Sequence, residues 1–481
     1  MRLWFLVHIL LICWKKWQIN AKMRVVCYYA NWSLYREAMP ILYPDQIDPT
    51  LCTHIHYAFA DIDPLTLNII PTELHDVQWT DRHSMPLYLR MYGLKRRNPS
   101  LKIILAVGGW TARSKGFNAV LRSDTSRAKF INQTIQYINE WNFDGLDLDW
   151  EFPGDRDRDA APDSQIKFDI LVKDLYQAFN DEVKKPNNTR QRLILTAAVA
   201  ADPKKIDHGY IVQNLCGHLD YVNIMTYDYH GKNSSIYYWL ERGCPAEKMN
   251  LGLAIYGRTF TLADEVNNTL GSPVSEGGEA GPYTKEEGIL AYFEICQKLR
   301  ANNWTTEWDH DSQAQYAYYE NQWVGYDSLR SATLKVIWAK TLGLGGAMLW
   351  TLDYDDYTGL FCGRGMFPFT KRVHETMFDD VITSATASNL TDNSTPLSDT
   401  SAINLLSTQI IDSKKQSPSS TIINIYSSPL SSRNTTRNTK IISDHRIKND
   451  GGERQQQQKF YYSIIITLWI LHEVNNLSVI H

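Results

Sequence analysis

The sequence predicts an α/β fold, namely a (β/α)8 barrel with a small α+β insertion between its seventh strand and its last helices. From Arg24 to Phe378, eight short apolar runs alternate with helical patterns. Several runs are nearly continuous in Val, Ile, Leu and Ala, as expected for parallel strands that are covered on both faces. The rival is an open doubly wound sheet. Its first strand would usually precede a Gly-rich phosphate turn, and "CYYANWSLY" is not one.

The individual elements can be placed in chain order. Expected strands are "RVVCYYA", "THIHYAFA", "KIILAVGG", "GLDLDW", "LILTAAV", "YVNIMTY", "LGLAIYG" and "GGAMLW". Helical stretches between them include "SRAKFINQTIQYINEWN" and "SQIKFDILVKDLYQAFNDEV". The connection between "LAIYGRTF" and "GGAMLW" is too long for a single helix. It predicts an inserted subdomain over about residues 259–330, followed by the last barrel helix from Ser331 to Leu342.

The two ends of the chain differ from this barrel region at 22–378. Residues 1–21 carry Arg2, an apolar run from Leu3 to Trp14, and Ala21. This pattern is typical of a signal peptide, with an uncleaved anchor as the alternative, and the run is short for a bilayer span. Residues 379–459 are rich in Ser, Thr and Asn and predict a disordered linker, open to O-glycosylation. Residues 460–481 form a short apolar tail of unassigned role, and no stable membrane span is expected.

Composition narrows the function classes. The 481 residues are 43% hydrophobic and 21% charged, which is ordinary for a globular enzyme. A net charge of −4 argues against a nucleic-acid-binding protein. Cleavage of the signal would remove Cys13 and leave six Cys, an even number that suggests disulfides in a secreted protein. Their spacing neither fixes the pairing nor fits a zinc site. Sequons for N-glycosylation occur at Asn132, Asn187, Asn267, Asn303, Asn389 and Asn393.

The stretch "FDGLDLDWEFPG" places three acids, Asp147, Asp149 and Glu151, at alternate positions. In a strand, alternate side chains share a face, so one face carries the acids and the other carries apolar groups. Four interpretations compete. A solvent-facing antiparallel strand fits the alternation but not the surrounding pattern of strands and helices. A divalent metal site lacks a phosphate-cradling loop. A non-catalytic sugar-binding site and acid catalysis in a glycosidase remain, and the last is favoured.

Acid catalysis explains why like charges are placed together. Reactive groups of parallel barrels lie at the C-terminal ends of strands, and Glu151 is the last acid before Pro153 and Gly154 end this strand. A general acid must stay protonated near neutral pH, and an anionic Asp149 would raise the pKa of Glu151. Asp147 lies deeper and can share a proton with Asp149. The three acids would then form a relay.

The same stretch resembles the D-G-x-D-x-D-W-E signature of the family 18 glycoside hydrolases, the chitinases. Other stretches that resemble this family follow in the right order, namely "CYYANW", "LCTHIHYAFA", "LKIILAVGGW", "VNIMTYDYHG", "LAIYGRTF", "AGPYTKEEG", "NQWVGYDS" and "GGAMLWTLDYDD". The resemblance covers roughly Met23 to Phe378 and is strongest to secreted animal chitinases of the arthropod and vertebrate kind. It implies an extracellular, monomeric, endo-acting hydrolase of the β-1,4 N-acetylglucosamine linkages in chitin, without cofactor or metal.

The resemblance also implies a mechanism in which the protein supplies no nucleophile, because the N-acetyl oxygen of the substrate attacks the anomeric carbon. Glu151 would protonate the leaving oxygen, Asp149 would hold the acetamido N–H, and Tyr227 would donate to the acetamido oxygen. Asp228 would help to position the sugar. The implied substrate-binding residues are the sugar floor Trp350, the stacking residues Trp32 and Trp110, and the cleft residues Tyr28, Met225, Tyr256 and Arg258.

Further implications concern disulfides and function. The resemblance implies the pairs Cys27–Cys52 and Cys296–Cys362, and leaves open whether Cys216 pairs with Cys244. A chitinase-like lectin that binds chitin or chitooligosaccharides without cutting is the alternative function. Lectin-type relatives usually lack the acid at the Glu151 position, so its presence favours the enzyme.

One segment departs from the family. After "MTYDYHG" the family usually carries a Trp and a long loop, whereas this chain continues "GKNSSIYYWLERGCP". The short crossover is expected to weaken one wall of the cleft and to leave part of the barrel wall uncovered.

Overall fold

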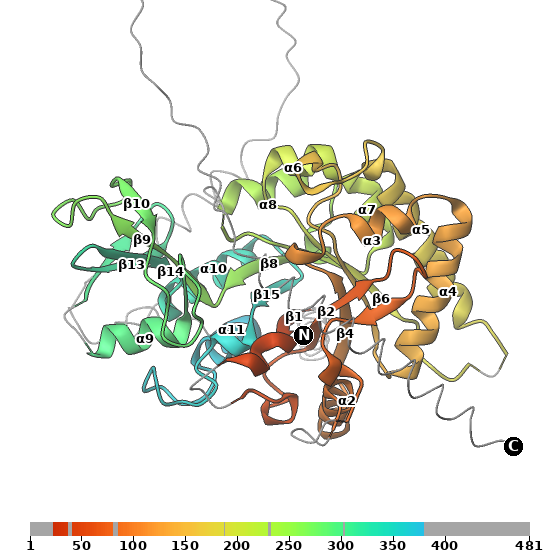
Figure 1. The fold of residues 1–481 in the computed structure, drawn as a ribbon, viewed down its shortest axis with the longest axis horizontal. Helices are drawn as coiled ribbons and strands as arrows, with labels where there is room; N and C mark the ends of the chain where they lie inside the picture. The colour runs from red at the N-terminus through yellow and green to blue at the C-terminus, as the bar shows by residue number, and fades with distance from the viewer. Residues whose placement is uncertain are drawn as a thin grey trace, which may run out of the picture. The chain divides into compact units, whose positions relative to one another are not determined.

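The computed structural model describes residues 23–36, 41–79, 85–186, 188–228, 232–301 and 304–379. The expected signal peptide at 1–21, the expected linker beyond Asp379 and the tail at 460–481 lie outside these residues. Parallel strands form a closed barrel, because the first strand pairs with both the second and the last (Figure 1). The barrel strands are β1 (Arg24–Ala30), β2 (His54–Ile62), β4 (Lys102–Gly108), β5 (Gly145–Asp149), β6 (Ile194–Val199), β7 (Tyr221–Ile224), β8 (Met249–Ala254) and β15 (Gly346–Trp350). The prediction of a (β/α)8 barrel is confirmed.

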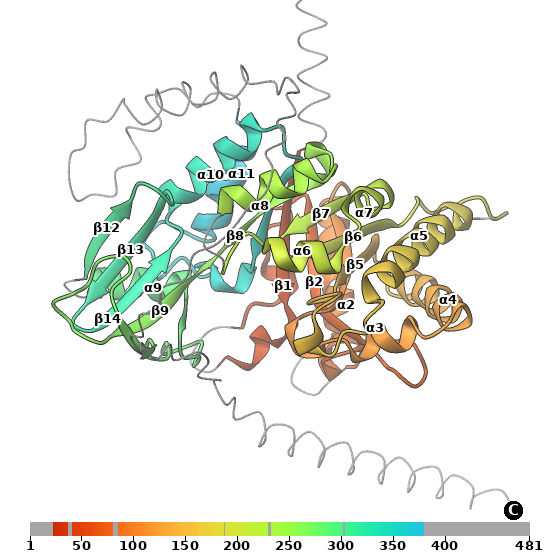
Figure 2. The same cartoon turned by 90° about the horizontal axis from the view of Figure 1, so that it is seen from above.

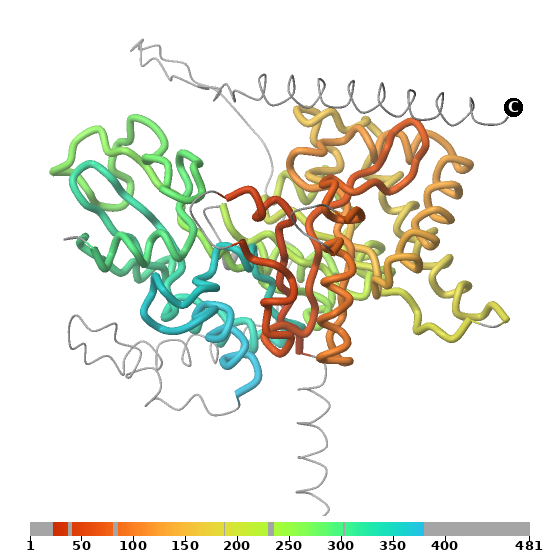
Figure 3. Tube along the Cα trace, turned by 60° about the horizontal axis from the view of Figure 1, so that its bottom comes forward, coloured from red at the N-terminus to blue at the C-terminus, as the bar shows by residue number. Residues whose placement is uncertain are grey.

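Helices cover the outside of the barrel. They are α2 (Leu87–Arg97), α3 (Lys115–Val120), α4 (Asp124–Glu140), α5 (Ser164–Glu182), α6 (Pro203–Gly209), α7 (Val212–His218), α8 (Lys232–Glu241), α10 (Leu329–Thr341) and α11 (Pro368–Phe378). In α5 the buried residues Phe168, Leu171 and Leu175 recur at helical spacing, so one stripe faces the strands. The helix α11 packs against β1, which brings the two ends of the barrel chain side by side (Figure 3).

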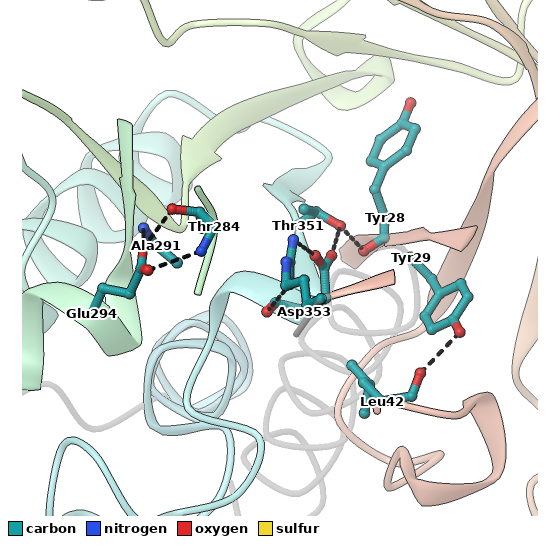
Figure 4. Close-up of polar contacts among 9 residues, drawn as sticks. Tyr28, Tyr29, Leu42, Thr284, Ala291, Glu294, Thr351 and Asp353 are labelled. Atoms are coloured by element: carbon teal, nitrogen blue, oxygen red, sulfur yellow. Dashed lines mark hydrogen bonds and ion pairs between the residues drawn. The ribbon is translucent and has the colours of Figure 1, made fainter. Parts of the chain in front are cut away.

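The inserted subdomain is an antiparallel sheet with one helix. Its elements are β9 (Tyr256–Leu262), β10 (Val274–Gly277), β11 (Ile289–Ala291), α9 (Tyr292–Ala301), β12 (Thr305–Asp309), β13 (Ala314–Tyr319) and β14 (Gln322–Tyr326). Figure 2 shows these strands grouped apart from those of the barrel. The carboxylate of Glu294 accepts N–H bonds from Thr284 and Ala291, at 3.0 and 2.9 Å, and ties the start of α9 to its preceding loop (Figure 4).

The stretch "LGLAIYG", expected as one strand, is divided between the two sheets. The barrel strand β8 ends at Ala254, and β9 begins at Tyr256 in register with Ala291. Between them the Ile255 N–H donates to Trp350 O at 2.8 Å. The insertion therefore starts directly at the end of a barrel strand. A short strand that the sequence did not suggest, β3 (Ile69–Pro71), extends the barrel sheet by pairing antiparallel with β2.

Three disulfides join elements of the described chain: Cys27–Cys52, Cys296–Cys362 and Cys216–Cys244. The first two are the pairs that the resemblance implied, and the third settles the pair that was left open. It links α7 to the turn after α8. In α8 the side chains of Ile236 and Trp239 are buried, and Trp239 Nε1 donates to Ala200 O at 3.0 Å. The expectation of an uncovered barrel wall is therefore wrong for the described part of the crossover.

We expect the double replacement Cys216→Ala and Cys244→Ala to destabilise the protein by about 3 kcal/mol. The bond closes a loop with a sequence separation of 28, and a loop of this size restricts the unfolded chain by roughly that amount. Denaturant unfolding of wild type and variant would measure the loss. An unchanged midpoint would show that packing of α8 alone holds the short crossover in place.

Among the described residues, none of the helices combines the length and apolar character that crossing a bilayer requires. The same residues contain no group of three His, Cys, Asp or Glu side chains arranged to hold a metal ion.

Candidate active site

The acidic side chains of β5 point into the barrel, while Leu146, Leu148 and Trp150 pack outward. Outside the barrel, the Trp150 ring stacks on Phe117 with centroids 4.9 Å apart. Its Nε1 donates to Ser114 Oγ at 2.9 Å. These contacts fix the end of β5 and therefore the direction of the acids on its other face.

Asp147 is the deepest acid, and its side chain is fully buried. The hydroxyls of Tyr28 and Thr196 each donate to its carboxylate at 2.6 Å. The ring of His56 lies beside it, with Nδ1 at 3.2 Å from Oδ2. Burial alone would raise the pKa of Asp147, but the His56 ring and the two hydroxyl donors outweigh it and lower the pKa. Asp147 is therefore held as a carboxylate.

Asp149 lies nearer the C-terminal mouth of the barrel than Asp147, and its pKa is shifted in the opposite direction. Burial, and then the neighbouring charges of Glu151 and Asp147, raise its pKa well above the ordinary value. Its Oδ1 is buried and has no hydrogen-bond partner among the described residues. The backbone of Asp149 is approached closely by the chain at the end of β4, where Gly108 is the last strand residue and Gly109 follows it. A Cβ on Gly108 would lie 2.2 Å from Asp149 O, and Gly109 N–H donates to that oxygen at 2.7 Å.

Glu151 follows the end of β5 and is partly exposed at the C-terminal mouth of the barrel. Burial raises its pKa to about 7, against the opposing effect of the cations Arg158 and Lys205 and with a further contribution from Asp228. Arg158 Nε also donates to the Glu151 carbonyl at 2.5 Å. The group is therefore a carboxyl that can hold a proton near neutral pH.

Tyr227 and Asp228 follow β7 and face the same mouth. The Tyr227 hydroxyl lies 3.9 Å from Met348 Sδ, which is only a weak acceptor, so it is available to a stronger one. Asp228 has a left-handed backbone with φ +57°. Its carboxylate accepts two hydrogen bonds from the Arg258 guanidinium: Nε donates to Oδ1 at 2.7 Å, and Nη2 donates to Oδ2. Tyr256 lies edge-on to Tyr227, with ring centroids 6.2 Å apart.

A cluster of aromatic rings, the aromatic floor, lies in the same barrel mouth as these polar groups. Trp350, at the end of β15, lies beside the rings of Tyr28, Trp32 and Phe59, with centroids at 5.3, 6.1 and 5.7 Å. Directly after it, Thr351 Oγ1 donates to Tyr28 O at 2.7 Å and fixes this corner of β15 to β1 (Figure 4).

Two further residues that were expected to bind substrate, Met225 and Trp110, differ from each other in their surroundings. Met225, which follows β7, is half-buried and packs against the apolar clusters inside and around the barrel. Trp110 projects from the end of β4 and is 56% exposed. The Arg158 guanidinium lies over its ring at 3.5 Å from the centroid, so one face of this ring is covered by a cation.

Four residues of the site were missed from the sequence, namely His56, Arg158, Thr196 and Lys205. Two of them point inward from barrel strands, and the alternation of "THIHYAFA" and "LILTAAV" could have placed His56 and Thr196 on the inner face. Arg158 comes from a short 3-10 helix after β5 and Lys205 from the short helix α6 after β6, and no periodic signal marks either residue.

A closed parallel barrel with a carboxyl at a strand end that can hold a proton, beside an aromatic floor, is an arrangement typical of the glycosidase class of proteins. Comparison with known families agrees, since residues 24–355 match "Glycosyl hydrolases family 18". The chain belongs to this family.

Its relatives include both enzymes and binding proteins. The chain is 36% identical to "Chitotriosidase-1" of Mus musculus over 384 residues, which cover 74% of this chain and 79% of that protein. It is 37% identical to "Chitinase-3-like protein 2" of Homo sapiens over 403 residues, 78% of this chain and 97% of that one. Among solved structures, a human YKL-39 described as "a pseudo-chitinase with retained chitooligosaccharide binding properties" matches with TM-score 0.67 and 36% identity. The match covers 74% of this chain and all of that one.

Proposed function

We propose that the protein is a secreted, endo-acting chitinase that hydrolyses β-1,4 N-acetylglucosamine linkages by substrate-assisted, retaining catalysis. The observation that carries the proposal is the pair Asp149 and Glu151. Glu151, whose pKa is raised to about 7, lies at the mouth above the buried carboxyl of Asp149, and Oδ1 of Asp149 has no hydrogen-bond partner among the described residues. Secretion is supported by the three disulfides, which persist in oxidising compartments.

The other carboxylates support an attack by the substrate itself. Asp147 is buried and held by Tyr28 and Thr196, and Asp228 is engaged by Arg258. Neither is placed as a free nucleophile. A 2-acetamido group bound beside Asp149 would instead present its carbonyl oxygen to the anomeric carbon.

In the first step the Glu151 carboxyl gives its proton to the glycosidic oxygen as the bond from that oxygen to the anomeric carbon breaks. The acetamido oxygen forms the new bond to the same carbon, so the nitrogen-containing ring carries the positive charge. Asp149 accepts the acetamido N–H, and the Tyr227 hydroxyl donates to the acetamido oxygen. Glu151, now a carboxylate, then takes a proton from the water that attacks the anomeric carbon, while the bond from that carbon to the acetamido oxygen breaks and the neutral acetamido group is restored.

The aromatic side chains would bind the sugar rings. Trp350 with Tyr28 would form the floor under the sugar whose bond is cut, and Trp32 would continue the surface on one side. Trp110 would stack a sugar with its remaining face. Met225, Tyr256 and Arg258 would line the walls. We propose that chitooligosaccharides are bound by a single protein chain.

We expect the first-formed product to keep the anomeric configuration, and turnover to require a 2-acetamido group. Two displacements at one carbon, first by the acetamido oxygen and then by water, restore the original configuration. Proton NMR of early product would measure the anomer, and cellulose oligomers are the matched substrate without the acetamido group. Early α-anomer, or cleavage of cellulose oligomers, would contradict substrate assistance.

We expect kcat/KM to fall as the pH rises through about 7. The pKa of Glu151 is raised to about 7, and the group acts only in its protonated form, so activity is present below this pKa and lost above it. The measurement is a pH–rate profile with a small fluorogenic chitobioside. A rate that stays constant between pH 6 and pH 9, about one unit below and two units above that value, would assign the acid to another group.

The second candidate is a chitin-binding lectin without activity. It is favoured by the likeness to YKL-39, described as a pseudo-chitinase that retains chitooligosaccharide binding. Turnover of the chitobioside by the wild-type protein separates the two functions, since only the enzyme releases the fluorophore.

A further inference from the structure

His56 is a titratable group in the middle of the barrel that the mechanism above does not use. It points inward from β2 and is fully buried. Its Nδ1 lies 3.2 Å from Asp147 Oδ2, and its Nε2 lies 3.0 Å from the Tyr221 hydroxyl on β7. A buried imidazole beside a buried carboxylate is costly unless the two compensate each other.

We propose that His56 is a positioning residue that keeps Asp147 ionised, so that the mobile proton of the acidic column stays on Asp149 and Glu151. The inference rests on the proposed function, because it concerns the same three acids. Nδ1 has no well-aligned hydrogen-bond acceptor in the described part of the chain, so its contact with Asp147 is mainly electrostatic.

The other donors at Asp147 cannot replace His56. Tyr28 and Thr196 offer neutral hydroxyls, which bond to the carboxylate but bring no cation into the barrel. An imidazole can carry positive charge, and an opposite charge at this distance favours the ionised form of an acid. The pKa directions agree, since that of Asp147 is lowered while that of Asp149 is raised.

Among the described residues that pack against His56, the acidic partner is Asp147. On β1 the Tyr28 ring lies 4.9 Å away, and the Arg24 guanidinium lies over the Tyr221 ring rather than over His56. On β4 the register partner is Ile104, which does not titrate. On β2 itself, His54 points to the same face and lies edge-on to Tyr221, with centroids 5.3 Å apart. Burial lowers the pKa of His54 to about 3, so it is neutral under working conditions.

The test is the acidic limb of the pH profile of kcat/KM. His56→Leu removes the group that opposes burial of Asp147, so the pKa of Asp147 should rise, and the acidic limb should move to higher pH by about one unit or more. The alkaline limb, which reports Glu151, should move less. His54→Leu is the matched control, because it removes a neighbouring imidazole that does not contact Asp147, and its acidic limb should stay in place.

A conservative variant separates this role from simple packing. In His56→Asn the amide nitrogen occupies the position of Nδ1 and can donate to Asp147, so it should recover part of the shift. An acidic limb that is unchanged in a folded His56→Leu protein, or displaced equally in the Asn and Leu variants, would overturn the proposal.

The coupling between His56 and Asp147 can also be measured from the free energy of unfolding, without any measurement of activity. Failure of this inference can therefore be told apart from failure of the proposed function. A double-mutant cycle on unfolding uses His56→Leu, Asp147→Asn and the combined variant at neutral pH. If His56 stabilises the Asp147 carboxylate, His56→Leu should cost less when Asp147 is already replaced. Equal costs in both backgrounds would overturn the inference even if the protein turns over chitin.

Discussion

Replacement of Glu151 by Gln is expected to abolish hydrolysis while chitooligosaccharide binding is retained. The amide has the size of the acid but no proton to deliver, and general acid catalysis accounts for roughly two to four powers of ten in rate. The neighbouring Asp149 is buried below the mouth, and Asp147 is held as a carboxylate, so neither is placed to substitute. Chitobioside turnover and calorimetric titration with a chitooligosaccharide would measure the two properties.

Glu140→Gln is the matched control, because this exposed glutamate lies at the end of α4, away from the strand ends that form the site. It should leave both properties unchanged. Near-normal turnover by the Glu151→Gln variant would remove Glu151 from the mechanism.

We expect Tyr227→Phe to lower kcat by about 10²–10³-fold, the usual effect of removing one preorganised donor to a charge that develops in the transition state. The change should hardly affect stability, because the contact that the hydroxyl makes is a 3.9 Å approach to the Met348 thioether. KM should change much less than kcat, since the bond to the acetamido oxygen strengthens during reaction. The measurement is steady-state kinetics on the chitobioside.

Tyr238→Phe removes a hydroxyl outside the site, where it donates to Asp207 at 2.6 Å. Its kcat should equal that of the wild type. If Tyr227→Phe retains full kcat, the acetamido oxygen must be stabilised by another donor, and the role assigned to Tyr227 would have to be withdrawn.

The sequence was informative wherever a period repeats. Alternation of Asp147 and Asp149 with Leu146 and Leu148 predicted an acidic face, and the structure places these acids inside the barrel. Continuous apolar runs were a second informative signal. They predicted parallel strands, because both faces of such strands are covered.

Side chains that meet only through barrel closure could not be predicted. His56 and Asp147 are separated by many residues and by an intervening strand, and their contact depends on the strand register. Arg158 reaches Glu151 and Trp110 from a short 3-10 helix after β5. The break at Ile255 was hidden because the residues on both sides of it belong to strands: its N–H still donates to Trp350 O on β15, and the next residue, Tyr256, already pairs in the other sheet.

Closure of the barrel by β1 and β15 has a consequence for how the chain folds. The paired residues Arg24 and Gly346 lie at opposite ends of the barrel sequence, so this contact has a very high sequence separation. Such pairings make folding slow and come late, after the intervening strands have assembled. Until β15 is synthesised, β1 and β8 each present an open, apolar edge that invites pairing with another chain. A nascent chain is therefore most prone to aggregation just before its last barrel strand emerges, and truncation before Gly346 would make that state permanent.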